Sequence, residues 1–224
     1  MSHPSTKSTE KTLSREENRR KALAGVQAIF DRYKLVKARS GPAFDNATMA
    51  DCVVLDASIG PPRDDDAAVL PAGSGLPLPP DMGIRASCTT RLFVGSELGN
   101  YNGVMHGGAA GVIFDMLTTI ALGPVARPGF WTFLGGVTRT LNISYLKAVP
   151  VGTTVIVHAY VYQVGRQTAY IKGWMMSEDS KTTYAVCDHH KIHVPTPAEH
   201  MTLKVPWDEQ WDEGGKEKKT ASKL

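Results

Sequence analysis

Apolar residues recur at helical spacing in two stretches of the chain. After Gly107, the residues on one side of a helix form a wide apolar stripe: Val112, Ile113, Met116, Leu117 and Ile120. This pattern predicts a buried helix that begins near Gly107 and ends near Gly123-Pro124. Residues 14–39 begin with the spacing of a capping box, Ser14-Arg-Glu-Glu17, and continue with apolar residues at helical spacing. We expect this segment to form an amphipathic helix that packs on the domain.

The remaining apolar segments are typical of β-strands. We place strands at Asp51–Ile59, Ile84–Val94, Trp131–Lys147, Thr153–Val164, Thr168–Ser177 and Thr183–Val194. One helix among antiparallel strands predicts an α+β domain in which the sheet wraps around the helix. A single helix cannot cover both faces of such a sheet or fill its edges, so we expect the chain to pair with a second copy.

Composition divides the chain into a central domain and two extensions. Residues 1–13 are polar, and we predict that they are disordered. Residues 50–194 carry the predicted domain, and residues 61–80 within it are rich in proline, glycine and acidic residues, which indicates a loop insertion. Residues 195–224 form a tail whose charged end, from Trp207 onward, we expect to be solvated.

The last three residues, Ser222-Lys223-Leu224, match the peroxisomal targeting signal that an import receptor reads. The sequence therefore predicts a peroxisomal protein of a eukaryotic cell, with the cytoplasm as the alternative.

The overall composition limits the possible classes of protein. The net charge of +3 is small and the basic residues are scattered, so nucleic acid binding is not indicated. We expect no membrane span, because no stretch reaches 18 uncharged apolar residues. Three cysteines without a CxxC spacing, at Cys52, Cys88 and Cys187, indicate reduced thiols in a protein core.

The predicted central helix carries a second, narrow stripe of unusual residues. Gly108, Gly111 and Asp115 share one face, and two glycines cost a helix about 1 kcal/mol each relative to alanine. A close-packed partner or a bound ligand would explain the bare backbone. The unpaired N–H groups at the helix start suit a developing anion, and the carboxylate lies two turns along. On spacing alone, the structural interpretation is favoured, in which Asp115 is a satisfied buried polar group and His106 is a helix cap.

These residues resemble the signature of hotdog-fold acyl-CoA thioesterases. Asn100 lies six residues before His106-Gly107-Gly108, and Asp115 follows nine residues after His106. The resemblance continues from Gly136 to Gly152 and covers roughly residues 50–194. It is closest to the branch with phenylacetate-pathway and mammalian thioesterase-superfamily members. It implies an antiparallel sheet of five to six strands around one central helix, here with an extra N-terminal helix, in a homodimer or tetramer.

The resemblance also implies roles for individual residues, and no cofactor beyond the coenzyme A of the substrate. Asp115 would orient or deprotonate water, or attack directly as a nucleophile. The Gly107 N–H would hold the thioester oxygen with support from His106, and Asn100 would position the water or the His106 loop. Thr138 stands where close relatives place a serine that positions water. In the family, the carboxylate of one subunit faces the His-Gly-Gly of the other.

For coenzyme A, the family uses a strand–turn–strand region that corresponds to Gly165-Arg166-Gln167-Thr168. Arg166 would pair with a phosphate. Gly108, Tyr145 and His193 are further candidates for substrate contacts. His189, His190 and His193 do not predict a metal site, because His189 and His193 lie about 13 Å apart along a strand and His190 points the other way.

Two other functions are compatible with the same residues. One is a hotdog dehydratase, isomerase or cyclase that acts on a thioester intermediate of a biosynthetic pathway. The other is an acyl-CoA binding protein without catalytic activity.

Overall fold

The computed structural model describes residues 14–41, 43–60, 83–212 and 214–218. The residues outside these ranges include the predicted disordered N-terminus 1–13, the 61–80 insertion and the Ser222-Lys223-Leu224 tripeptide. The helices are α1 (Arg15–Ser40), α2 (Asn46–Asp51) and α3 (Gly107–Thr119). The strands are β1 (Val53–Ile59), β2 (Ala86–Phe93), β3 (Val137–Tyr145), β4 (Thr154–Val164), β5 (Thr168–Ser177) and β6 (Thr183–Ile192).

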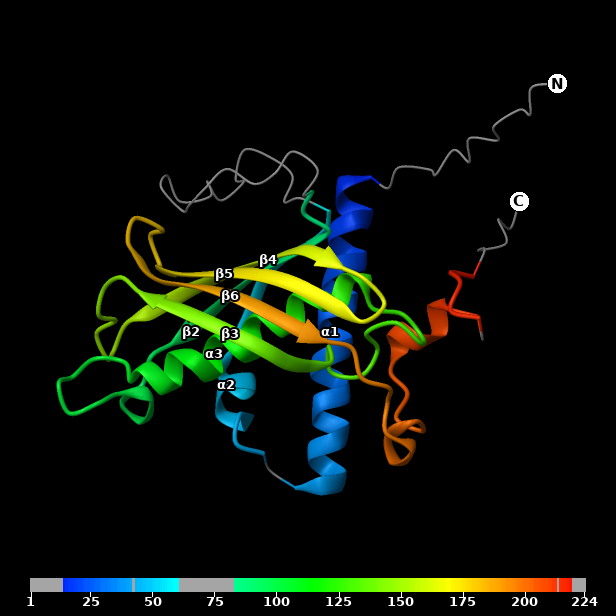
Figure 1. Cartoon of the computed structure of the whole chain (residues 1–224), viewed down its shortest axis with the longest axis horizontal. Helices are drawn as coiled ribbons and strands as arrows, with labels where there is room; N and C mark the ends of the chain where they lie inside the picture. Colours follow the sequence, from blue (N-terminus) through cyan, green and yellow to red (C-terminus); the bar gives the residue numbers. More distant parts are fainter. Residues whose placement is uncertain (1–13, 42, 61–82, 213, 219–224) are drawn as a thin grey trace.

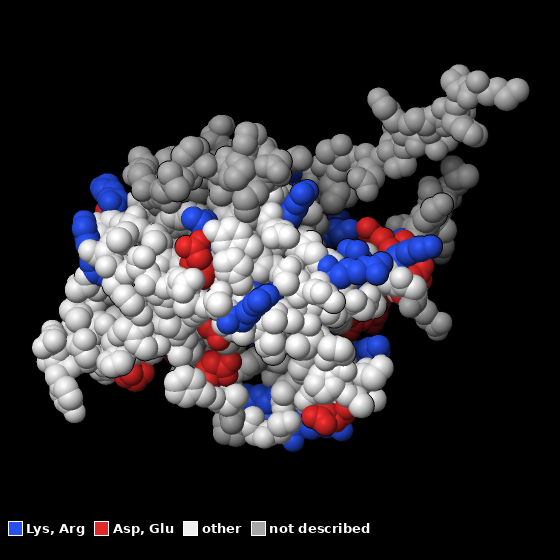
Figure 2. Space-filling model, in the orientation of Figure 1, with Lys and Arg blue, Asp and Glu red and all other residues white. Residues whose placement is uncertain are grey.

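The six strands form one antiparallel sheet in the order β1-β2-β4-β5-β6-β3. The sheet curves around α3, while α1 crosses one end of the sheet (Figure 1). This arrangement confirms the predicted α+β architecture with one central helix and an additional N-terminal helix. On the face shown in Figure 2, basic and acidic side chains are interspersed among uncharged ones.

The side of α3 that packs against the sheet differs slightly from the predicted stripe. Ile113, Leu117 and Ile120 are buried as expected, but Val112 and Met116 are only half-buried. The buried stripe is instead completed by Ala110, Phe114 and Thr118. The sheet covers this side, so the opposite side of α3, with Gly108, Gly111 and Asp115, is the less buried one.

The segment Gly107–Val125 is long and apolar enough to span a membrane by length and composition, although it contains the charged residue Asp115. An 18-residue window of this segment is 61% buried inside the fold, and the core helix of a soluble protein passes the same test. After Thr119 the helix does not stop but tightens into a 3-10 helix, η2 (Ile120–Val125), which contains Pro124.

Helix α1 is fixed to the domain by a close backbone contact with η2. Ser14 forms the predicted capping box with Glu17. An added Cβ at Gly25 would lie 2.5 Å from the Gly123 carbonyl oxygen, so only glycine permits this approach. Val26, Ile29 and other residues of α1 join the main core on either side of the contact. Ile29 and Tyr33 of α1 also line a cavity described below.

Three sequence predictions are wrong in detail. The strand placed at Trp131–Lys147 begins only at Val137, because Trp131 has a positive φ of 56° and its ring is fully buried in the preceding loop. Helix α2 was not predicted. Trp207 does not belong to a solvated tail: it is buried in a small cluster with Ala28 and Val205, and its indole N–H donates to the Ala126 carbonyl at 3.0 Å.

Candidate active site

The start of α3 presents a free backbone donor. His106 is the N-cap, and its Nδ1 accepts a hydrogen bond from the Gly108 N–H at 2.9 Å. The Gly107 N–H, at the first helical position, has no hydrogen-bond partner in the described part of the chain. It lines a cavity of about 280 Å³ with Tyr145, whose hydroxyl donates to the Gly107 carbonyl at 2.8 Å. A helix start with a free N–H beside a cavity is suited to an anionic oxygen.

Asn100 shapes the loop that carries His106. Its side-chain oxygen accepts from the Asn102 N–H at 2.9 Å, and its carbonyl accepts from the Gly103 N–H at 3.0 Å. The turn is closed by a bridge between Gly99 and Met105. The contacts of Asn100 in one chain are therefore those of a residue that holds the loop in place.

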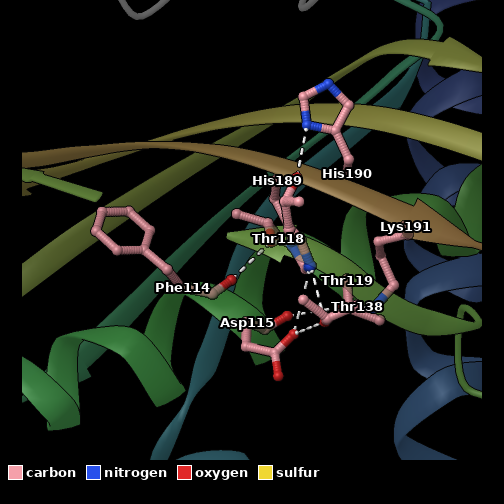
Figure 3. A network of polar contacts seen from close by, with 9 residues as sticks. Phe114, Asp115, Thr118, Thr119, Thr138, His189, His190 and Lys191 are labelled. Carbon is pink, nitrogen blue, oxygen red and sulfur yellow. Dashed lines mark hydrogen bonds and ion pairs between the residues drawn. The ribbon is translucent and has the colours of Figure 1, made fainter. Parts of the chain in front are cut away.

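Asp115, two turns along α3, lies at the edge of a polar network (Figure 3). Its side chain is 42% exposed, and its Oδ1 accepts a hydrogen bond from the Thr138 hydroxyl of β3 at 2.5 Å. The same hydroxyl lies 2.9 Å from Nε2 of His189 on β6, and Nδ1 of His189 lies 2.6 Å from the Thr118 hydroxyl of α3. Three elements therefore converge on one carboxylate.

The directions of these hydrogen bonds can be assigned. A hydroxyl bonded to a carboxylate makes the stronger, charge-assisted bond when it donates, so Thr138 gives its proton to Asp115. His189 then donates from Nε2 to Thr138, and its Nδ1 shares the single proton of the Thr118 hydroxyl with the Phe114 carbonyl, which accepts from that hydroxyl at 2.6 Å. In this assignment Thr138 passes a hydrogen bond from His189 on to the Asp115 carboxylate.

Burial keeps His189 neutral. The side chain is fully buried, and desolvation, with smaller contributions from Lys191 and His190, lowers its pKa from 6.5 to about 3. The 3.4 Å contact between His189 Nε2 and Asp115 Oδ1 is therefore not an ion pair at neutral pH. His189 acts as a fixed hydrogen-bonding group beneath Thr138.

Lys191, two residues further along β6, is a second buried polar group on the same side of the strand. It is 3% exposed, and its ammonium donates to the Thr119 hydroxyl at 2.8 Å. Burial lowers the pKa of Lys191 from 10.5 to about 8, opposed by the charge of Asp115.

One chain does not bring the free donor and the carboxylate together. Gly107 and Asp115 are eight residues apart on the same helix, which corresponds to about 12 Å. They also line different cavities, the second of which has a volume of about 310 Å³. Between them, an added Cβ on Gly111 would meet only Ile143, at 3.9 Å. Nothing in the described chain therefore explains the bare backbone at this position.

The candidate coenzyme A residues lie at two separate places. Gly165, Arg166, Gln167 and Thr168 form the turn between β4 and β5, where the Gln167 carbonyl accepts from the His193 N–H at 2.8 Å. Arg166 is exposed. Tyr145 is paired with Ala185 at the other end of the sheet, about 20 Å away along β6. The structure thus brings His193 to the turn but leaves Tyr145 beside Gly107.

Sequence analysis missed the roles of His189 and Lys191 in the network around Asp115. The signal was present, since Cys187, His189 and Lys191 alternate along a strand whose inward positions are otherwise apolar. Polar residues at inward strand positions need buried partners. Only the packing of β6 on α3 shows that those partners are Thr118, Thr119 and the hydroxyl that holds Asp115.

Comparison with known proteins agrees with this architecture. Residues 102–184 match the family model described as Thioesterase superfamily. No curated protein matches the chain in sequence.

Among solved structures, zebrafish thioesterase superfamily member 2 is similar with a TM-score of 0.51 and 21% identity, over 71% of this chain and 93% of that chain. Mouse thioesterase superfamily member 2 has a TM-score of 0.49 and 17% identity, over 72% of this chain and 94% of that chain. The Escherichia coli PaaI protein from the phenylacetic acid degradation operon has a TM-score of 0.48 and 13% identity, over 74% of this chain and 94% of that chain. The zebrafish structure identifies the fold as the hotdog fold.

The burial of neutral His189 predicts a specific loss of stability in acid. Between about pH 6.5 and 3 the unfolded chain binds one more proton at this residue than the folded chain, so stability falls as the pH falls through this range. From pH 6.5 to 5 the loss is about 2 kcal/mol. Denaturant unfolding of His189→Gln should show a correspondingly shallower dependence on pH. Replacement of the exposed neighbour, His190→Gln, should leave the slope unchanged. Equal slopes for wild type and His189→Gln would contradict the assignment.

Proposed function

We propose that the chain hydrolyses acyl-CoA thioesters at a site shared between two copies. The thioesterase-superfamily match supports thioester hydrolysis in general. One observation supports this proposal most directly: α3 carries both a backbone donor and a carboxylate, each beside a cavity. The Gly107 N–H has no partner among the described residues and lies beside one cavity, and Asp115, hydrogen-bonded to Thr138, lies beside the other.

The chemistry follows from these two groups. The Gly107 N–H and the positive end of the α3 dipole stabilise the thioester oxygen as it gains negative charge. Asp115 either removes a proton from a water molecule that attacks the carbonyl carbon or attacks that carbon itself, and both routes remain open. The carbon–sulfur bond then breaks, and the departing thiolate takes up a proton to give the coenzyme A thiol. In the water route the other product is the free acid, whereas in the direct route a water molecule first hydrolyses the anhydride between the acyl group and Asp115. His106 supports the oxyanion site by fixing the first turn of the helix.

Thr138 and His189 serve Asp115 by holding its carboxylate in one orientation. Because the Thr138 hydroxyl accepts from His189 while it donates to Asp115, it cannot rotate freely. The methyl group of threonine adds a second restraint relative to serine. A fixed carboxylate needs no reorganisation as the reaction proceeds.

Two features support a site built from two chains. An added Cβ at Gly111 would meet only the end of the Ile143 side chain among the described residues, at 3.9 Å, so a second α3 could approach its backbone. The edge strand β3 is largely exposed, and Val137 and Tyr145 on it are 48% and 57% exposed. A two-fold contact over these surfaces would bring Gly107 of each chain toward Asp115 of the other. Arg166 on the β4–β5 turn is the candidate for a phosphate of coenzyme A.

We further propose that the protein acts in peroxisomes through Ser222-Lys223-Leu224. A chain with an N-terminal fluorescent protein is expected to colocalise with peroxisomes, and deletion of these three residues is expected to return it to the cytoplasm. A peroxisomal signal that survives the deletion would count against the proposal.

Hydrolysis is tested by thiol release from a panel of acyl-CoAs. Asp115→Asn is expected to lower kcat/KM by about 100-fold or more, because the amide can neither take a proton nor attack. Asp188→Asn is the matched control, since this carboxylate lies on the other face of β6, where it contacts Lys172 at 3.5 Å. A loss below about tenfold in Asp115→Asn, roughly 1.4 kcal/mol, would remove Asp115 from the mechanism.

Analysis of the products by mass spectrometry distinguishes the other two functions. An altered acyl chain that is still attached to its carrier would favour a dehydratase, isomerase or cyclase. Tight binding without turnover of any acyl-CoA would favour a binding protein.

The oxyanion role of Gly107 can be tested at one position with two substitutions. Gly107→Pro removes the N–H, and the helix should persist, because proline is favoured at the first helical position and His106 has the extended ψ of 136° that a following proline requires. We expect a loss of about 100- to 1,000-fold in kcat. Gly107→Ala keeps the N–H, and its Cβ would lie 3.5 Å from the Tyr145 hydroxyl, an ordinary contact. We expect it to stay within about tenfold of wild type.

Mixing Gly107→Pro with Asp115→Asn by denaturation and refolding tests the shared site. About half of the resulting dimers contain one chain of each variant. In such a dimer one of the two sites combines an unchanged Gly107 with an unchanged Asp115, and the other site lacks both groups. About a quarter of wild-type activity should therefore return. If each chain held a complete site of its own, mixing would restore nothing.

A further inference from the structure

The cavity beside Asp115 has an apolar wall and a polar wall. Its volume is about 310 Å³, near the lower end of the range for small-molecule sites. The apolar lining comes from Ile29 of α1, Met116 of α3, Ile120 of η2, and Leu134. Lys191 lies among the polar lining residues, which also include Asp115, Thr119 and Thr138.

Lys191 has hydrogen-bonding capacity that the described residues do not use. An ammonium group carries three N–H donors, and the hydrogen bond to the Thr119 hydroxyl uses one of them. The described part of the chain offers no second hydrogen bond and no ion pair to Lys191. The residue is 3% exposed, so bulk water does not freely satisfy the other donors. A buried donor left unsatisfied costs about 1–3 kcal/mol, more for a charged group, which a ligand acceptor would offset.

The position of the ammonium relative to Asp115 limits which ligand atom it can contact. The Thr119 hydroxyl that accepts from Lys191 itself donates to the main-chain carbonyl of Asp115 at 2.6 Å. The ammonium is therefore anchored to the helical turn that bears the carboxylate. A thioester whose carbonyl carbon lies at Asp115 would bring the first few atoms of its acyl chain to Lys191.

The charges around the cavity select the kind of acceptor. Asp115 and Asp45 both line the cavity, against the single cation of Lys191, so an acyl chain with its own carboxylate would add a third negative charge. Like charges at short range disfavour one another in a partly buried site. A neutral oxygen, such as a hydroxyl or keto oxygen, accepts from the ammonium without that repulsion.

We propose that Lys191 is a specificity-determining residue that donates a hydrogen bond to a hydroxyl or keto oxygen on C3 of the acyl chain. The inference rests on the proposed thioester hydrolysis and adds the class of substrate, namely short 3-oxygenated acyl thioesters. The oxygen on C3 is two bonds further from the reacting carbonyl carbon than C2 is. Lys191 is suited to contact an atom at that position, because its ammonium donates to the Thr119 hydroxyl, which in turn donates to the main-chain carbonyl of Asp115. The alkyl remainder packs against the apolar wall that α1 completes.

The test uses matched pairs of substrates: 3-hydroxybutyryl-CoA with butyryl-CoA, and 3-hydroxyhexanoyl-CoA with hexanoyl-CoA. Wild type is expected to prefer the hydroxylated member of each pair by about tenfold in kcat/KM, since a hydrogen bond to a charged donor is gained. In Lys191→Met, which keeps the length of the side chain, this ratio should fall to about one. Lys172→Met is the matched control because Lys172 lies on the outer face of β5 beside Asp188, and it should keep the wild-type ratio.

The ratio within a pair, and not the absolute rate, is the readout, because general damage to the site lowers both members equally. A wild-type ratio near one, or a Lys191→Met ratio equal to that of wild type, would overturn the proposal.

Binding separates failure of the inference from failure of the proposed function. Non-hydrolysable thioether analogues of each pair are titrated calorimetrically into wild type and Lys191→Met. If no acyl-CoA is hydrolysed, the proposed function fails, but tighter binding of the hydroxylated analogue to wild type alone would still support Lys191 as its donor. Equal binding of both analogues to wild type would exclude that role, and this measurement does not depend on the folding of any variant.

Discussion

The packing of the curved sheet around α3 orients this helix within the domain. It buries Ile113, Phe114 and Leu117 and thereby fixes the rotation of the helix about its axis. With that rotation fixed, the stripe of Gly108, Gly111 and Asp115 must lie on the opposite, less buried side. The same burial that stabilises the domain therefore decides which residues remain accessible for chemistry.

The burial of polar groups beneath Asp115 costs folding free energy. His189 and Lys191 are buried on the inner face of β6, and burial disfavours the charged form of each. Apolar residues at these two strand positions would avoid that cost. The hydroxyls of Thr118, Thr119 and Thr138 offset part of it by hydrogen bonding. Such networks concentrate where a catalytic group must be held, which is the reason to relate them to Asp115.

Helix α1 links stability to the cavity. The Gly25–Gly123 contact brings the two backbones close, and Ile29, one turn further along α1, lines the cavity beside Asp115. This helix lies outside the segment that matches the thioesterase family model. The wall that would contact an acyl chain therefore comes partly from a region that the family match does not cover.

Local patterns predicted the secondary structure well where one signal dominated. The capping box at Ser14 and the helix start at Gly107 both follow from nearby residues. The predictions were wrong where tertiary contacts overrode local preference. The sequence predicted Trp131 to be a strand residue. In the structure it has a positive φ, and its indole N–H donates to the Gly165 carbonyl at 2.7 Å. Trp207 reads as part of a charged tail, yet it is held against α1 by a small apolar cluster.

Helical periodicity, strand alternation and the spacing of Asn100, His106 and Asp115 are properties of short segments, so the amino-acid sequence was enough to predict the fold class and to propose which residues carry the chemistry. Three-dimensional packing was needed to show that His189 and Lys191 lie beneath and beside Asp115, and that the Gly107 donor and the carboxylate line separate cavities. These facts depend on how β6 packs on α3 and on how far one helix separates two of its own residues. Contacts between residues some seventy positions apart, such as Thr118 with His189, leave no local pattern in the chain.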